Sequence, residues 1–174
     1  MSDTASESIC LSCGLCCDGS IFTRITLALS DRVDILEAAG VVLSKKDERT
    51  EMRLRCTALD GTCCTIYEDR PVRCGLFTCA LHRRHSAGEV GTDEALATIA
   101  KTRELQAKVL DGLAAMLDDG DVRAPGRSFS DVIERMQAML NDAPDRRAVE
   151  EAHALTLLYA KAFVQRISSL FRNH

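Results

Sequence analysis

The sequence lacks an apolar run of the length that crosses a membrane. A transmembrane helix needs about 20 consecutive apolar residues, and no stretch of the 174-residue chain approaches that length. The first ten residues also lack the basic and apolar segments of a secretory signal peptide. We therefore expect a cytoplasmic protein without a membrane segment, in a compartment that keeps thiols reduced.

An excess of basic residues is also missing. The chain has 22 lysines and arginines against 26 aspartates and glutamates, with a formal net charge of −4. Binding of nucleic acid depends on a basic face, so no nucleic-acid partner is expected. No glycine-rich nucleotide-binding motif and no Ser/His/Asp or Cys/His triad signature occurs either. Whether the protein is an enzyme, and of which class, therefore stays open.

No cysteine follows Cys79, whereas nine lie at or before it. Cysteine at this density serves either disulfides in an oxidising compartment or a metal in a reducing one. A complete disulfide framework would leave one of nine thiols over. For a chain expected in the cytoplasm, the sequence favours metal thiolates.

Four of these thiols lie within eight residues, in the run Cys10-Leu-Ser-Cys13-Gly-Leu-Cys16-Cys17. A Cys-x-x-Cys step turns the chain so that two sulfurs can reach one metal. Successive side chains diverge, so the adjacent Cys16 and Cys17 suggest two neighbouring metals or a cluster with several coordination corners. The second cysteine region, Cys56 to Cys79, has turn signals and little room for long elements, so bound metal would help to hold it.

The rest of the chain predicts helices. A short strand or extended segment is expected within 20–29, a short helix over 30–40, and a solvated loop or exposed turn in the charged run 45–51. Apolar residues at three- and four-residue spacing predict helices from Thr92 to about Gly120, from Ser128 or Ser130 to about Asn141, and from about Asp145 through Leu170.

The predicted fold is mainly α. A loop-rich, cysteine-containing metal-binding region with a short helix, residues 1–86, would pack with a helical hairpin or three-helix bundle, residues 87–174. At this length we expect the two regions to form a single domain. The oligomeric state is not predicted.

The cysteine motifs resemble the YkgJ-type CxxCxxCC family of zinc- or iron-chelating proteins. The resemblance covers roughly Cys10 to Cys79 and rests on the first cysteine run and on Gly61-x-x-Cys64-x-Ile66-Tyr67-x-x-Arg70-Pro71-x-x-Cys74. It implies eight metal-ligating thiolates, which would make two sets of four. These are Cys10, Cys13, Cys16, Cys17, Cys56, Cys64, Cys74 and Cys79.

Two features depart from the family pattern. Cys63 is an additional thiol beside Cys64, which leaves open which of the two ligates, although Cys64 has the family spacing to Ile66 and Tyr67. Gly75 follows Cys74 where family members usually have arginine. The cysteine run also resembles one in flagellin lysine methylases, which are thought to carry an iron-sulfur centre.

The cofactor is therefore expected to be zinc or an iron-sulfur cluster. The spacing and a closed all-thiolate shell favour zinc, whereas the adjacent cysteines and the methylase resemblance favour iron-sulfur. The protein would then be an enzyme or an accessory subunit, a structural zinc module whose helices bind a partner protein, or a thiol redox or metal-handling protein.

Histidine, arginine and tyrosine side chains near the cysteines are further candidates for a role at the metal sites. His82 and His85 would share a helical face just after Cys79, where they are expected to face solvent unless one of them completes a metal site. Arginines surround the second cysteine region and would form a solvated rim or balance thiolate charge, and Arg70 is the one favoured for a specific role. Tyr67 is expected to pack rather than to act as an acid. The arginines are Arg53, Arg55, Arg70, Arg73, Arg83 and Arg84.

Overall fold

The structure is a computed structural model that describes residues 9–172. Most of the N-terminal stretch that the sequence predicts not to be a signal peptide, residues 1–8, lies outside the described residues. Within 9–172 no helix combines the length and the apolar character that a membrane-spanning helix requires.

Helices dominate the described chain, which confirms the predicted mainly α fold. The strands are short and all lie before residue 65. In chain order the elements are β1 (Arg24–Thr26), α2 (Val33–Ala38), β2 (Leu43–Lys46), β3 (Arg49–Arg53), β4 (Leu59–Asp60), β5 (Cys63–Cys64), the 3-10 helix η1 (Tyr67–Asp69), α3 (Val72–Leu76), α4 (Ala80–Ser86), α5 (Thr92–Leu117), the 3-10 helix η2 (Gly120–Arg123), α6 (Phe129–Asp142), α7 (Arg146–Ala152) and α8 (Ala154–Leu170).

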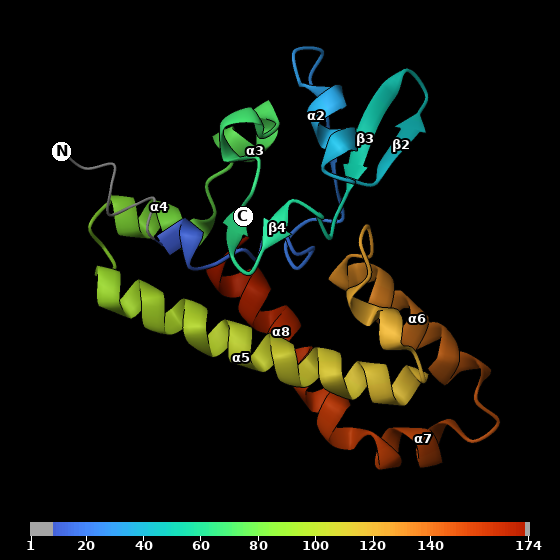
Figure 1. Ribbon diagram of the computed structural model, residues 1–174. Helices are drawn as coiled ribbons and strands as arrows, with labels where there is room; N and C mark the ends of the chain where they lie inside the picture. Colours follow the sequence, from blue (N-terminus) through green and yellow to red (C-terminus); the bar gives the residue numbers. More distant parts are fainter. Residues whose placement is uncertain (1–8, 173–174) are drawn as a thin grey trace.

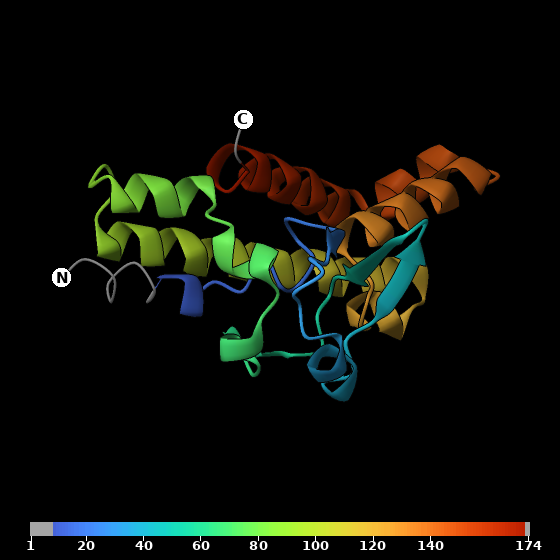
Figure 2. The same ribbon diagram turned by 90° about the horizontal axis from the view of Figure 1, so that it is seen from above.

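The long helix α5 is the centre of the helical part and packs against α4, α6, α8 and η2. Figure 1 shows it running along the molecule, with α2, α3 and the strands β2 and β3 on the opposite side from α7. Seen from above in Figure 2, α8 lies along one side of α5. The side chains buried between these helices include Ile99, Val109, Leu113, Val132, Met136, Leu140, Phe163 and Ile167.

The contact between α5 and α8 depends on a glycine. A Cβ atom at Gly112 would lie 2.5 Å from Oγ1 and 2.8 Å from Cγ2 of Thr156 on α8. Such distances are shorter than van der Waals contact, so any larger residue would push the two helices apart. Gly112 costs α5 some intrinsic helix stability but permits the close approach.

The N-terminus of α6 has a complete capping box. The Ser128 side chain accepts a hydrogen bond from the amide of Asp131, and the Asp131 carboxylate accepts one from the amide of Ser128. These bonds satisfy backbone N–H groups at the start of the helix, which have no intrahelical acceptor. The prediction that Ser128 or Ser130 opens this helix is therefore confirmed for Ser128.

The sequence predicts one long helix from about Asp145 through Leu170, and this prediction is wrong in one respect. The structure has two helices there, α7 and α8. Asp145 caps α7, and His153 then separates α7 from α8 with φ −114° and ψ 19°. Because the backbone dihedral angles of His153 are not helical, the axis of α8 takes a different direction from that of α7. The apolar spacing continues across His153, which is why the sequence pattern predicted an uninterrupted helix.

The charged run 45–51 forms more structure than the predicted loop. Strands β2 and β3 pair antiparallel, with Lys46 opposite Arg49, so that only Asp47 and Glu48 form the exposed turn. Strand β1 adds to the other edge of β3, and the sheet order is β1-β3-β2. Of the five residues of β3 only Met52 is buried, so the strand has no apolar alternation that would identify it in the sequence.

Candidate metal centres

The first cysteine run is folded by local backbone hydrogen bonds. The amide of Cys13 donates to the carbonyl of Cys10 at 3.0 Å, and the amide of Cys17 donates to the carbonyl of Gly14 at 3.0 Å. Two reverse turns therefore follow one another and bring Cys10, Cys13 and Cys16 together, as expected from the Cys-x-x-Cys spacing.

The second cysteine region is held against the first by its backbone. The amide of Cys56 donates to the carbonyl of Cys17 at 2.9 Å. Beyond it, β4 and β5 form a two-stranded hairpin in which Leu59 lies opposite Cys64. Pro71 then begins α3, which carries Cys74.

One set of thiols gathers around the first run, and we call it the first thiol group: Cys10, Cys13, Cys16 and Cys79. Burial raises the pKa of Cys13 to about 12, and the neighbouring Cys79 and Cys10 thiols raise it as well. Burial also raises the pKa of Cys16 well above its ordinary value, with further contributions from Cys13, Cys17, Cys79 and Cys10. The last member, Cys79, comes from the start of α4, 63 positions after Cys16 in the sequence.

The other set, the second thiol group, consists of Cys17, Cys56, Cys64 and Cys74. Burial raises the pKa of Cys17 to about 12, and Cys74, Cys56 and Cys64 raise it further. Burial likewise raises the pKa of Cys74 to about 12, together with Cys56 and Cys64. The pKa values of Cys17 and Cys74 therefore both respond to Cys56 and Cys64.

The same division appears in the packing. Cys13, Cys16 and Cys79 pack with the core between the helices. Cys17, Cys56 and Cys74 pack with a second, smaller core, whose buried members are Leu36, Val41, Met52, Leu54, Cys56 and Ala58. Adjacent in sequence, Cys16 and Cys17 thus point to different cores, as expected for successive side chains.

An aromatic pair lies where the two cores meet. Phe22 packs against both, and its ring meets that of Phe77 edge-on at 4.6 Å between centroids. Phe77 precedes Cys79 and follows Cys74, so the chain crosses from the second thiol group to the first at this aromatic contact.

The donor chemistry of both groups fits zinc or iron. Thiolate sulfur is the preferred ligand of zinc and of iron-sulfur clusters, and four thiolates complete either kind of site. No disulfide joins any of the nine cysteines, all of which lie in the described part of the chain. Within residues 9–172, however, no three Cys, His, Asp or Glu side chains already stand at the spacing of metal ligands. Ligation would therefore require the sulfurs of each group to draw together.

The adjacent residues Cys63 and Cys64 have different surroundings. The Cys63 side chain is exposed, and its sulfur lies 3.9 Å from the carbonyl oxygen of Leu11. Cys64 is half-buried and affects the pKa of Cys17, Cys56 and Cys74. Cys64 is thus the member of the pair that lies among other thiols.

The histidines and Arg70 have local structural contacts. Nδ1 of His85 lies 2.9 Å from the carbonyl oxygen of Val90, and because a carbonyl only accepts, this nitrogen donates. The amide of His82 donates to the sulfur of Cys79 at 3.4 Å, which caps α4. The guanidinium of Arg70 lies 3.6 Å above the Tyr67 ring and donates to the Tyr67 carbonyl at 2.7 Å, so the pair braces the chain before Cys74.

Sequence reasoning missed the polar residues that tie α5 to the first cysteine run. Gln106 donates a hydrogen bond to the buried carboxylate of Asp18 at 2.7 Å, and Arg103 donates to the carbonyl of Cys13 at 2.6 Å. These partners are about 90 positions apart in the chain, with no motif linking them. Only the periodicity of α5 was visible in the sequence, and it does not identify which polar side chain faces a distant loop.

Comparison with known proteins places the cysteine region in a family. No curated protein and no solved structure matches the chain significantly. The model of the CxxCxxCC family, described as a putative zinc- or iron-chelating domain, matches residues 9–104. That description supports metal binding and leaves zinc and iron as alternatives. The match covers more than half of the chain, from the first cysteine run into α5, and the chain therefore belongs to the CxxCxxCC family.

Proposed function

We propose that this protein holds two metal centres, each ligated by four cysteine thiolates. The first thiol group, Cys10, Cys13, Cys16 and Cys79, would bind one centre. The second thiol group, Cys17, Cys56, Cys64 and Cys74, would bind the other. The observation that carries the proposal is that six of the eight thiols, Cys13, Cys16 and Cys79 against Cys17, Cys56 and Cys74, pack with two separate cores. The effects of Cys10 on the pKa of Cys13, and of Cys64 on the pKa of Cys17, support adding these two thiols to the first and the second group.

The burial of these thiols supports a bound cation. A buried thiolate without a nearby positive charge is costly, and accordingly the pKa of Cys13, Cys17 and Cys74 rises to about 12 in the protein alone. A metal ion would offset that cost and keep the sulfurs deprotonated. The metal would also join the first run to α4, and β5 to α3.

The identity of the metal follows from one measurement on protein purified without oxygen. Zinc at about two ions per chain, without colour or sulfide, would identify two closed tetrahedral sites. Iron with inorganic sulfide and a broad visible absorption band would identify clusters. Protein without either metal, with its cysteines paired as disulfides, would contradict the proposal.

Substitutions test the division into groups. Cys79→Ser removes a ligand from the first thiol group, and Cys74→Ser removes one from the second. Each variant should lose about half of the bound metal, because a site with three ligands holds its metal far more weakly. If either variant lost all of the metal, the eight cysteines would form a single centre instead.

A structural role for the two centres is favoured by their donor sets. Four thiolates fill the coordination of tetrahedral zinc and leave no open position for a substrate. On this hypothesis the metals stabilise a scaffold, and two leucines of α8 one turn apart, Leu155 and Leu158, are 60% and 61% exposed and available to a partner. Removal of the metal with a chelator should then lower the melting temperature of the protein and speed proteolysis of the cysteine region; a chelated protein as stable as the metal-loaded one would contradict the structural role.

A further inference from the structure

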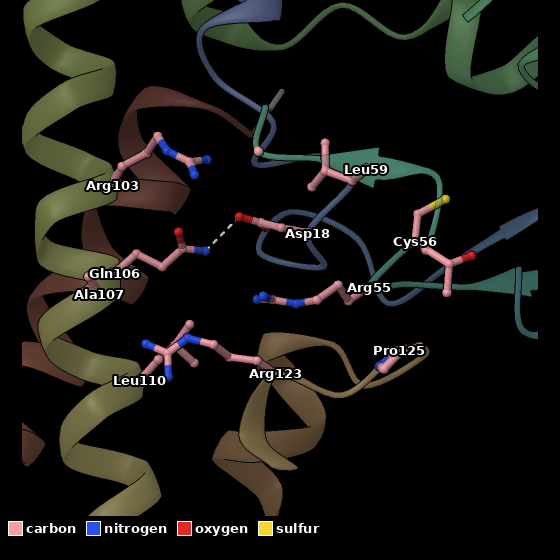
Figure 3. Close-up of a pocket in the computed structure, with 12 residues that line it drawn as sticks. Asp18, Arg55, Cys56, Leu59, Arg103, Gln106, Ala107, Leu110, Arg123 and Pro125 are labelled. Carbon is pink, nitrogen blue, oxygen red and sulfur yellow. Dashed lines mark hydrogen bonds between the residues drawn. The ribbon is translucent and has the colours of Figure 1, made fainter. Parts of the chain in front are cut away.

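A cavity of about 510 Å³ lies between α5, the segment 55–61 and the loop around η2. Figure 3 shows the side chains that enter it from these three elements. Its apolar wall includes Leu59, Ala107, Leu110 and Pro125, and its polar side chains include three arginines. Of the eight candidate metal ligands only Cys56 lines the cavity, and two further lining residues lie next to the first cysteine run: Asp18 follows Cys17 in the chain, and Arg103 donates to the carbonyl of Cys13.

The three arginines come from different parts of the chain. Arg55 precedes Cys56, Arg103 lies on α5 and Arg123 ends η2. In Figure 3 the guanidinium groups of Arg55 and Arg123 extend toward α5, whereas that of Arg103 extends from α5 toward the cysteine loops. The cavity therefore gathers positive charge from three directions.

This positive charge is only partly balanced by the protein. The single carboxylate that lines the cavity, Asp18, already accepts hydrogen bonds from the amide of Ser20 and from Gln106. Arg123 pairs with Asp111 at an exposed position, 2.8 Å apart. Among residues 9–172, Arg55 and Arg103 have no carboxylate at ion-pair distance.

Arg55 carries the strongest evidence for an absent partner. Its Nε is buried and has no hydrogen-bond acceptor, and in the described part of the chain no other buried side-chain nitrogen or oxygen is left in this way. A buried donor without an acceptor is costly, and native proteins rarely keep one without a function.

The backbone holds Arg55 in this position. Its carbonyl accepts a hydrogen bond from the amide of Gly126 at 2.8 Å, and the amide of the next residue, Cys56, bonds to Cys17 at 2.9 Å. These two bonds fix the main chain at Arg55 and Cys56, and Figure 3 shows the Arg55 guanidinium directed toward α5.

We propose that this cavity is a binding site for an organic oxyanion, a small molecule with a phosphate or carboxylate head group. Guanidinium groups bind both head groups through paired N–H donors, and Nε of Arg55 is one of the donors that such a pair uses. The volume exceeds that of a bare inorganic ion and lies in the range of small-molecule sites. The apolar wall of Leu59, Ala107 and Leu110 would receive the uncharged part of the ligand.

The test is calorimetric titration of the purified, metal-loaded protein with inorganic phosphate and, separately, with succinate, at constant ionic strength set with chloride. Saturable binding of phosphate alone assigns a phosphoryl head group, and binding of succinate alone assigns a carboxylate. Binding of both supports the shared oxyanion chemistry. Binding of neither, up to about 10 mM, overturns the proposal, because three guanidiniums should reach at least millimolar affinity for a head group.

Two variants and a matched control locate the site. Arg55→Gln and Arg123→Gln should each weaken binding of the anion by about tenfold or more, since each removes a charged hydrogen-bond donor. Arg147→Gln, at an exposed arginine that pairs with Glu151 on α7, should leave binding unchanged. Equal weakening in all three variants would show nonspecific attraction and would overturn the proposal.

A second readout separates an anion site from a structural or charge-balancing role of Arg55. If the residue serves a ligand, Arg55→Gln should keep or raise the melting temperature in anion-free buffer and abolish the rise that the bound anion causes. Metal content is measured on the same samples. A variant that loses its metal but still binds the anion would show that Arg55 serves the thiolates, and the proposal would be wrong. Because Arg123 lies far from the cysteines in sequence, its variant tests the anion site even if the metal proposal fails.

Discussion

The amide of Cys56 donates a hydrogen bond to the carbonyl oxygen of Cys17 at 2.9 Å. This bond joins the end of the first cysteine run to the start of the second cysteine region, and both residues belong to the second thiol group. Cys16, one residue earlier, lies with the first thiol group. The two candidate centres are therefore neighbours connected through a single peptide unit, and substitutions in one group should be measured for their effect on the other.

The adjacent cysteines at 63 and 64 should differ in their effect on metal content. Cys64→Ser removes a thiol that lies among Cys17, Cys56 and Cys74, so we expect about half of the metal to be lost. Cys63→Ser alters an exposed thiol and should retain all of it. Metal analysis of the two variants, purified side by side, checks this expectation. The reverse result would assign Cys63 as the ligand.

The metal-free protein should lose stability in alkaline solution. The pKa of Cys13, Cys17 and Cys74 is about 12 in the folded chain against an ordinary value of 9.0. The unfolded chain therefore releases these protons first as the pH rises. The free energy of unfolding should hold its full value below pH 9 and fall between pH 9 and 12, by about 1.4 kcal/mol per pH unit for each such thiol.

Urea unfolding of the chelated protein at several pH values measures this slope. The metal-loaded protein is the control, because its ligating sulfurs are already deprotonated in the folded state and the same loss should not appear. A free energy of unfolding of the metal-free protein that stays constant from pH 8 to 11 would contradict the burial of these thiols. Even one thiol with its pKa raised by only about 1 would lower that free energy by about 1.4 kcal/mol, which urea unfolding detects.

Gly112→Ala should destabilise the packing of α5 against α8. A Cβ at this position would lie 2.5 Å from Oγ1 of Thr156, whereas a Cβ at Gly120 would meet nothing within 4 Å. Alanine gains up to about 1 kcal/mol in helix propensity, but overpacking costs about 1–3 kcal/mol. We expect a net loss of about 1–2 kcal/mol in the free energy of unfolding, measured with urea.

The Gly120→Ala variant is the control for this substitution and should change stability by less than about 0.5 kcal/mol. Shortening the opposing side chain provides a second check. In the double variant Gly112→Ala/Thr156→Ala the two shortest contacts, with Oγ1 and Cγ2 of Thr156, are removed, so stability should recover in part relative to Gly112→Ala alone. A double variant that is no more stable would show that Thr156 is not the obstacle.

Ser128→Ala should weaken the start of α6. The fully buried Ser128 hydroxyl bonds to Asp131 at 2.8 Å, and Asp131 in turn pairs with Arg53 of β3 at 3.3 Å. Loss of the cap should cost about 1–2 kcal/mol in the free energy of unfolding. Ser130→Ala, at a half-buried serine two residues later, is the matched control and should cost less. Equal losses would indicate that the cap itself contributes little.

The helices were predictable where the apolar spacing and the end signals agreed. Helix α5 begins at Thr92 and α6 is capped by Ser128, both at or beside the predicted positions. The break at His153 was not predictable, because the apolar stripe is continuous on both sides of it. The hairpin of β2 and β3 was missed because its residues are mostly polar and only Met52 is buried.

The sequence by itself determined the mainly α architecture and the eight cysteines that match the family, because helical periodicity and ligand spacing are local properties of a chain. Only the tertiary structure decided that Cys79 joins the first run while Cys17 joins Cys56, Cys64 and Cys74. It also decided that Arg55, Arg103 and Arg123 meet around one cavity. The physical reason is that both arrangements depend on the path of the chain between distant segments, which is set by packing on α5 and on the small sheet and leaves no periodic pattern in the sequence.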